Sequence, residues 1–302
     1  MKYKARSSMT AVGVAAALTM WMAAPAGAAT TRSAPSGSTY YLALGDSLAQ
    51  GEQPTPAGVD QETDQGYVDD IYSALLSTQP TLLVKKLGCP GETTGTMIKG
   101  GICNGPRASG RVLSQLTRAV DFLTKHAAQT SLITIDIGAN NVDDCITGGT
   151  VNTTCVTDGI HTVEKQLPKI LAAIRAVAPS VPIYAMNYYD PFLANYLAGG
   201  SGVTLAEESE SSAVTFNSDL DSIYGTYNAQ VADVQDTPFQ TTDFTTTDND
   251  MIDGNTVPDN VYDICAWTYM CVPSPQGPDI HANPTGYQMI ADEFLSVIEP
   301  PS

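Results

Sequence analysis

The sequence predicts an α/β protein, a three-layer α/β/α sandwich around a central parallel sheet of about five strands. Short apolar runs alternate along the chain with stretches whose apolar residues recur at helical spacing. Strands joined through helices pair in parallel, and such a sheet needs helices on both faces. The chain has 302 residues, of which 43% are hydrophobic and 15% charged, so it can bury a sizeable core and is not a disordered chain.

The N-terminal segment has the pattern of a secretory signal peptide. Three basic residues open it, Lys2, Lys4 and Arg6. An apolar stretch from Ala11 to Ala24 and the small residues Ala26-Gly27-Ala28 follow. The apolar run is short and ends in a cleavage pattern, which argues against a transmembrane anchor. We therefore expect a secreted protein without stable membrane insertion: a signal peptide over 1–28, a flexible lead-in over 29–38 and one domain over 39–302.

The charge balance is strongly acidic. The formal net charge is −18, and loss of residues 1–28 removes three positive charges and no negative ones, which gives −21. Such a protein repels nucleic acid and anionic membranes, so no nucleic-acid partner is expected. We expect a monomer whose acidity serves solubility outside the cell.

The six cysteines all lie after the predicted signal peptide. An even number in an oxidising compartment indicates disulfides, although six cysteines permit fifteen connectivities. Three pairs are close in sequence, and we expect bridges between Cys89 and Cys103, Cys145 and Cys155, and Cys265 and Cys271. A zinc site is disfavoured because no C-x-x-C pair is present and histidines are few.

The first predicted strand ends at a serine. Tyr40 to Leu44 is a run of five apolar residues, and Gly45 and Asp46 favour a turn. Ser47 therefore lies at the carboxyl edge of the sheet, where α/β proteins bind their ligands. This position makes Ser47 a candidate nucleophile, although Gly-Asp-Ser alone is also an ordinary turn.

Four more strands are expected from short apolar runs that are rich in β-branched or aromatic residues. They are 82–87, 132–137, 181–188 and 230–234. The run 132–137 is the clearest, because it ends in the turn-forming residues Gly138 to Asn141.

Helices are expected between these strands and after the last one, at 67–78, 112–127, 158–177, 216–227 and 283–298. In the first, Val68, Ile71 and Leu75 recur on one face. Two segments are expected to be irregular connections: 199–212, which is rich in Gly, Ser and Glu, and 237–260, which is rich in Thr and Asp.

A serine nucleophile needs a base, and histidine is the usual one at neutral pH. Of the three histidines, His126 and His161 fall inside helical patterns, where surface or packing roles are expected. His281 instead precedes a helix start, and Asp279 two residues upstream could orient its ring. Ser47, His281 and Asp279 are therefore the candidate catalytic residues.

An oxyanion formed at the substrate carbonyl also needs hydrogen-bond donors. The backbone N–H groups of Ser47 and Gly91 and the side-chain amide of Asn140 each follow a predicted strand. These three donors form the candidate oxyanion hole.

These segments resemble the four blocks of the SGNH (GDSL-type) serine hydrolases, and most of all the secreted lipases and esterases of actinobacteria. The blocks are Gly45-Asp46-Ser47-Leu48, Gly91, Gly138-Ala139-Asn140-Asn141, and Asp279 with His281. The resemblance covers residues 39–298 and includes the three close cysteine pairs. It implies that Ser47, Gly91, Asn140 and His281 are the residues that name the family.

Two positions depart from the family pattern. The acid usually stands three residues before the histidine, but Pro278 occupies that position and Asp279 stands two before. Either Asp279 supports His281, which we favour, or the Pro278 carbonyl does so in a Ser-His dyad. Asn141 stands where many members have Asp. The G-x-S-x-G elbow of α/β-hydrolases is absent, which excludes that runner-up.

The expected reaction is ester hydrolysis through an acyl-enzyme on Ser47, with no cofactor or metal. Five aromatic residues near the predicted edge are candidates for an acyl groove or for ordinary packing: Tyr188, Tyr189, Phe192, Trp267 and Tyr269. They favour lipid or medium-chain acyl esters as substrates. The alternatives are a carbohydrate acetylesterase of the same fold and a non-catalytic secreted binding protein on this scaffold.

Overall fold

A five-stranded parallel sheet forms the centre of the computed structural model, which describes residues 37–102, 113–247, 251–252 and 254–298. The spatial order is β4-β1-β5-β8-β9, and each neighbouring pair is parallel. The strands are β1 (Thr39–Gly45), β4 (Leu82–Lys86), β5 (Thr130–Asp136), β8 (Ile183–Met186) and β9 (Ala229–Ala232). The predicted α/β fold class is confirmed.

Burial explains why these runs form central strands. The last five residues of both β1 and β5 are buried, as are all four residues of β8, so these strands are covered on both faces. The chain runs from β1 to β4 on one side of β1 and then crosses to β5 on the other side. The loops after β1 and β5 therefore leave the sheet at a topological switch point, the usual place for a ligand site.

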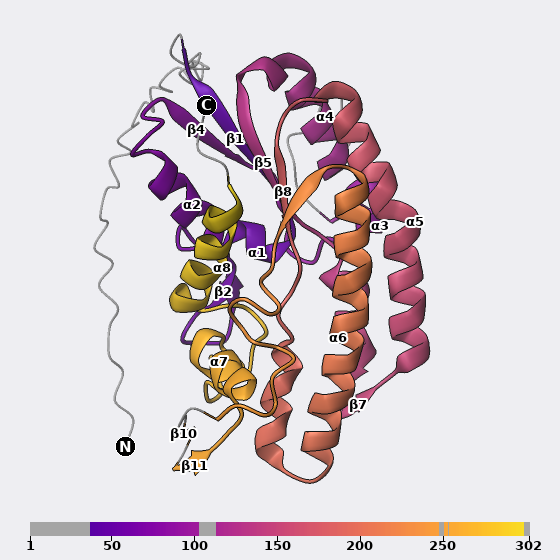
Figure 1. Cartoon of the computed structure of the whole chain (residues 1–302), viewed down its shortest axis with the longest axis vertical. Helices are drawn as coiled ribbons and strands as arrows, with labels where there is room; N and C mark the ends of the chain where they lie inside the picture. The colour runs from indigo at the N-terminus through magenta and orange to yellow at the C-terminus, as the bar shows by residue number, and fades with distance from the viewer. Residues whose placement is uncertain (1–36, 103–112, 248–250, 253, 299–302) are drawn as a thin grey trace, which may run out of the picture. The chain divides into compact units, whose positions relative to one another are not determined.

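Helices cover the two faces of the sheet as separate layers (Figure 1). One face carries α2 (Tyr67–Leu75) and α8 (Pro284–Val297), which pack on each other. The rings of Tyr67 and Phe294 stack between them with centroids 5.0 Å apart. The other face carries α4 (Gln115–His126), α5 (Thr153–Val177) and α6 (Ser201–Thr226).

Short elements complete the described chain. Three are α-helices: α1 (Ser47–Gln50), α3 (Thr94–Lys99) and α7 (Asp259–Trp267). Four are 3₁₀ helices: η1 (Ala127–Gln129), η2 (Ala139–Asn141), η3 (Asp143–Cys145) and η4 (Pro191–Ala198). Three are two-stranded hairpins: β2 (Gln53–Pro54) with β3 (Asp60–Gln61), β6 (Ile146–Thr147) with β7 (Thr150–Val151), and β10 (Met251–Ile252) with β11 (Asn255–Thr256).

The expected irregular connection over 199–212 is wrong, because α6 begins at Ser201 and continues to Thr226. Leu205, Ala206 and Ser209 are buried on one stripe, while most of the Ser and Glu residues between them face solvent. A helix that buries only a narrow stripe needs few apolar residues, so the Ser- and Glu-rich composition of this segment did not indicate a helix. The segment 237–260 likewise contains β10, β11 and the start of α7.

Two of the three predicted disulfides are confirmed, Cys145–Cys155 and Cys265–Cys271. The predicted Cys89–Cys103 bridge involves Cys103, which lies outside the described residues. The predicted signal peptide over 1–28 also lies outside them, as does the lead-in over 29–38 apart from its last two residues. No helix in the described ranges has the length and apolarity needed to cross a membrane.

Candidate active site

Ser47 lies in a tight turn at the end of β1. Gly45 has φ +142°, and a Cβ at this position would overlap the carboxylate of Asp136, so only glycine fits. Asp46 then acts as the N-cap of α1, because its Oδ1 accepts a hydrogen bond from the backbone N–H of Leu48 at 3.0 Å. These local features make Ser47 the first residue of α1, directly beyond the sheet.

His281 is held by Asp279. Oδ1 of Asp279 lies 2.8 Å from Nδ1 of the ring and accepts the backbone N–H of His281 at 2.9 Å. The loop is tied to the Cys265–Cys271 segment, since Tyr269 N–H donates to the His281 carbonyl and Asp279 N–H donates to the Tyr269 carbonyl. The carboxylate of Asp279 therefore orients the His281 ring through Nδ1.

Ser47, Asn140 and His281 line one cavity, although they come from three separate segments of the chain. The space between its walls is about 770 Å³, counting the part open to solvent. Three of the five aromatic candidates, Tyr188, Tyr189 and Phe192, also line it.

The other two aromatic candidates lie elsewhere. Trp267 packs edge-on against Phe239, and the hydroxyl of Tyr269 donates to Oε1 of Gln53. Neither is among the residues that line the cavity.

Gly91 lies on an exposed turn with φ +72° and is not among the residues that line the cavity. Its loop is nevertheless attached to the end of β1. The backbone N–H of Cys89 donates to the Gly45 carbonyl at 3.1 Å. The side chain of Gln115 links Glu92 to both backbone groups of Gly45 through bonds of 2.8 to 2.9 Å.

Asn140 and Asn141 follow β5 in η2. Asn140 contributes to the cavity wall, whereas Asn141 points to α3 and accepts hydrogen bonds from the backbone N–H and hydroxyl of Thr94 at 3.0 and 3.4 Å. Asn141 thereby joins the loop after β5 to the loop that carries Gly91. An Asp at this position could accept the same bonds, which gives a physical reason why either residue is suitable.

Several cavity residues were missing from the sequence-based set. They come from the segment between β5 and α5 and from α5 and α6: Val142, Asp143, Ile146, Val156, Ser209, Ser212, Ala213, Phe216 and Asn217. Ala213 and Phe216 are three residues apart and so share one face of a helix, which could have indicated that α6 lines the cavity. The sequence-based prediction starts this helix only at residue 216 and therefore omits Ala213.

Glu52 was also missed. Its Oε2 lies 3.6 Å from Nε2 of His281, across 229 residues of sequence. No local pattern around Glu52 predicts this contact.

Carboxylates dominate the electrostatics of the site. Burial by itself would lower the pKa of His281, but the hydrogen bond and charge of Asp279, with the charges of Glu52 and Asp60, raise it above its ordinary value. Burial opposes ionisation of Asp279, yet its hydrogen bond and charge interaction with His281 lower its pKa. Burial, with the charges of Asp46 and Asp190, raises the pKa of Asp143 to about 7.

One group among the described residues has metal-ligand spacing: Asp60, Asp279 and His281 offer atoms that lie within 4.8 Å of one another. Oδ1 of Asp279 is already bound to the imidazole and the backbone, and Asp60 is exposed to solvent. We assign no metal or cofactor to this group.

Comparisons with known proteins agree with the fold. No curated protein matches the sequence. Among solved structures, the extracellular lipase from Streptomyces rimosus is 19% identical, with a TM-score of 0.53 over 86% of this chain and 99% of that one. A lipase from a goat rumen metagenome is 15% identical, with a TM-score of 0.50 over 86% and 97%. At these identities the likeness shows the fold alone.

The comparison with protein-family models shows more than the fold. The model of one family matches residues 43–289, which include every candidate site residue described above. The chain belongs to the GDSL-like lipase/acylhydrolase family.

Proposed function

We propose that this protein is a secreted serine esterase that hydrolyses lipid or medium-chain acyl esters through an acyl-enzyme on Ser47. One observation carries the proposal: Ser47, Asn140 and His281 line the same cavity, and Asp279 holds the ring of His281 from the other side. Family membership supports the reaction class.

In the proposed mechanism, His281 takes the proton of the Ser47 hydroxyl as the serine oxygen attacks the ester carbonyl. Asp279 keeps Nδ1 protonated and stabilises the imidazolium. The N–H of Ser47 and the amide of Asn140, two residues of the cavity wall, donate to the oxyanion, and the Gly91 N–H is the proposed third donor, from the loop attached to the end of β1. His281 then protonates the leaving alcohol, and afterwards it activates a water that releases the acid.

The cavity wall supports an acyl chain as the group that binds there. Apart from the catalytic candidates, most of its lining is apolar, with contributions from Val142, Ile146, Val156, Ala213 and Phe216. Apolar walls with a few convergent polar groups are typical of small-molecule sites, and an acyl chain matches this chemistry.

A panel of aryl esters of increasing acyl length tests the substrate class. We expect kcat/KM to peak at medium or long chains. A maximum at acetate, together with acetate release from acetylated glycans, would favour the carbohydrate acetylesterase instead.

Covalent labelling tests the nucleophile. A fluorophosphonate probe is expected to label Ser47, as located by peptide mass. Ser47→Ala and His281→Ala should each lower kcat by about 10⁵–10⁶-fold, and the double variant little further, because the two groups act as a unit. Ser212→Ala, which changes another serine of the cavity, is the matched control. Near-normal turnover by Ser47→Ala, or labelling at another residue, would contradict the assignment.

Secretion is tested by the N-terminus of the exported protein. If residues 1–28 are a signal peptide, the mature chain begins at Ala29. Retention of the intact N-terminus in an actinobacterial secretion host would contradict this part of the proposal.

A further inference from the structure

The carboxylate of Glu52 faces the ring nitrogen of His281 that would take the serine proton. Oε2 of Glu52 is 3.6 Å from Nε2, whereas Oδ1 of Asp279 is 2.8 Å from Nδ1. The Glu52 and His281 side chains are only 13% and 10% exposed, so solvent screens the pair weakly. Both nitrogens of the ring therefore face carboxylates, an arrangement that suits an imidazolium.

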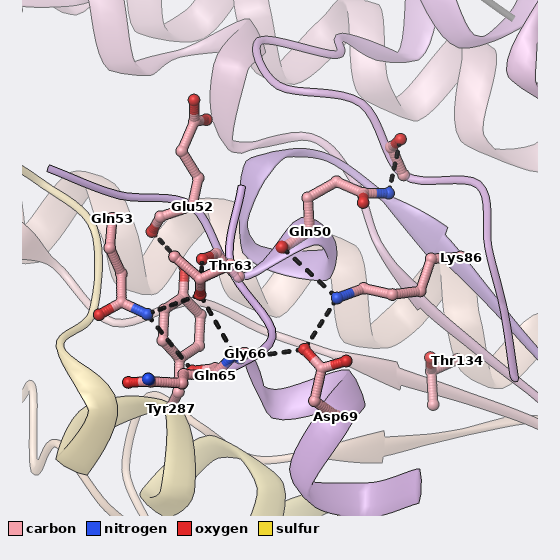
Figure 2. Close-up of polar contacts among 12 residues, drawn as sticks. Gln50, Glu52, Gln53, Thr63, Gln65, Gly66, Asp69, Lys86, Thr134 and Tyr287 are labelled. Atoms are coloured by element: carbon pink, nitrogen blue, oxygen red, sulfur yellow. Dashed lines mark hydrogen bonds and ion pairs between the residues drawn. The ribbon is translucent and has the colours of Figure 1, made fainter. Parts of the chain in front are cut away.

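The backbone of Glu52 is fixed relative to the nucleophile. Its N–H donates to the Ser47 carbonyl at 3.1 Å, and its carbonyl accepts the Tyr287 hydroxyl of α8 at 2.8 Å. Figure 2 shows the contact of the Glu52 carbonyl with Tyr287, and the Glu52 side chain, which points away from the surrounding polar contacts.

The residues that flank Glu52 are held as well. Lys86 pairs with Asp69 of α2 at 2.8 Å and reaches the Gln50 carbonyl, and the hydroxyl of Thr63 donates to the Gly51 carbonyl at 2.6 Å (Figure 2). The backbone that carries the Glu52 side chain is therefore held beside Ser47, and its carboxylate lies 3.6 Å from Nε2 of His281.

The charged groups that act on the ring from the segments packed around it are all carboxylates among the described residues: Asp46 before α1, Glu52 after it, Asp60 in β3, Asp143 in η3 and Asp279. Of these, Glu52 is the one whose oxygen approaches Nε2. Burial raises the pKa of Glu52, and the charge of His281 opposes that rise.

We propose that Glu52 is a positioning residue for His281, whose carboxylate faces Nε2–H in the free enzyme and holds the ring as an imidazolium. His281 must lose this proton before it can accept one from Ser47. The enzyme is then inactive at acidic pH and becomes active only at a higher pH than Asp279 alone would require. This inference rests on the proposed roles of Ser47 and His281.

The test is a pH titration of His281 in the wild type and in Glu52→Gln, in which NMR signals of the imidazole ring report the midpoint. Loss of the opposite charge should lower the titration midpoint by about one pH unit. The acidic limb of kcat/KM for an aryl ester should move to lower pH by the same amount. Asp60→Asn, which removes a charge from an exposed carboxylate, is the matched control and should give less than half of that shift.

A His281 midpoint in Glu52→Gln that stays within about 0.2 pH unit of the wild type, or that matches Asp60→Asn, would overturn the inference. If Glu52→Gln does not fold, Glu52→Asp decides, because its shorter side chain should lower the midpoint partway. The NMR midpoint needs no turnover: a shifted midpoint without esterase activity would refute the proposed function, and activity with an unshifted midpoint would refute the role of Glu52.

Discussion

Single side chains set the geometry at the end of the sheet. Asp279 uses one oxygen for both the ring and the backbone of His281, and Gln115 joins Glu92 to Gly45. Asp279 thus holds a candidate catalytic residue itself, and Gln115 holds the segments next to Ser47 and Gly91, by hydrogen bonds that are buried or partly buried. Because these groups are shielded from water, loss of one partner costs about 1–3 kcal/mol for the group left behind.

Removal of the Asp279 charge tests the support of His281. Asp279→Asn should lower kcat by about 10²–10⁴-fold, because the ring loses the acceptor that selects its tautomer. Asp279 raises the pKa of His281, so the acidic limb of the residual activity should also move to lower pH. A full pH profile with an aryl ester measures both effects. A loss below about tenfold would favour the Pro278 carbonyl as the support.

A buried carboxyl pair lies behind the nucleophile turn. The hydroxyl of Tyr67 donates to Oδ1 of Asp136 at 2.8 Å, and the hydroxyl of Tyr188 donates to Oδ2 of Asp46 at 3.3 Å. Burial and the charge of Asp46 raise the pKa of Asp136 well above its ordinary value. A carboxyl whose pKa is raised in this way holds its proton to a higher pH in the folded state than in the unfolded chain, where Asp titrates at about pH 4.

The contribution of Asp136 to the free energy of unfolding should consequently fall as pH rises. A group with a raised pKa in the folded state contributes fully below its unfolded pKa, and this contribution is lost as pH rises through the folded pKa. The Asp136→Asn side chain stays neutral at every pH. The free energy of unfolding of this variant, relative to that of the wild type, should therefore increase between pH 4 and 8, by at most about 1.4 kcal/mol per pH unit. Denaturant unfolding at several pH values, with the exposed Asp158→Asn as control, measures this. A difference between the two proteins that does not change with pH would contradict a raised pKa of Asp136 in the folded state.

At the scale of elements, helix α6 does more than cover the sheet. Ser212, Ala213 and Phe216 form part of the cavity wall, and Asn217 binds both backbone groups of Tyr188 through its side-chain amide. The helix thus connects the cavity to the end of β8. An acyl chain in the cavity would contact this helix along its inner stripe.

A larger side chain on α6 should therefore shorten the acyl chain that is preferred. Ala213→Phe should lower kcat/KM for long-chain esters by about tenfold or more and leave acetate and butyrate esters within about threefold, because the added ring fills space in the apolar wall. Val214→Phe, one position along the same helix and outside the cavity lining, is the control. A uniform loss at every chain length would place the acyl chain elsewhere.

At the scale of the whole molecule, the disulfides join the loops that surround the sheet edge. Cys265–Cys271 holds the segment whose Tyr269 carries the His281 loop, and Cys145–Cys155 closes a loop that contributes Ile146 to the cavity. These bridges restrain the loops of the site.

Removal of the Cys265–Cys271 bridge should lower stability and activity together. The Cys265→Ser/Cys271→Ser protein is expected to lose about 2 kcal/mol, because a bridge over a short loop removes a modest chain entropy from the unfolded state. The melting temperature should fall by about 4–8 °C. The Cys145→Ser/Cys155→Ser protein, which lacks the bridge of a loop that does not carry His281, is measured in the same way for comparison. An unchanged melting temperature would show that hydrogen bonds alone hold the His281 loop.

Much of this molecule follows from local pattern. The buried strands, the glycine turn before Ser47 and the start of α8 after Asn283 are dictated by residues near them in sequence, so the fold class and the family blocks were predictable. Two of the disulfide pairs were predictable because short loops favour close partners.

Tertiary structure alone decided the rest. The first half of α6 is helical because its narrow stripe packs against the protein, which its composition does not reveal. The contact of Asp279 with the His281 ring depends on the path of one loop, and the contact of Glu52 with His281 joins residues far apart in the chain. Such contacts depend on how the loops converge at the sheet edge, since packing energy rather than local propensity positions them.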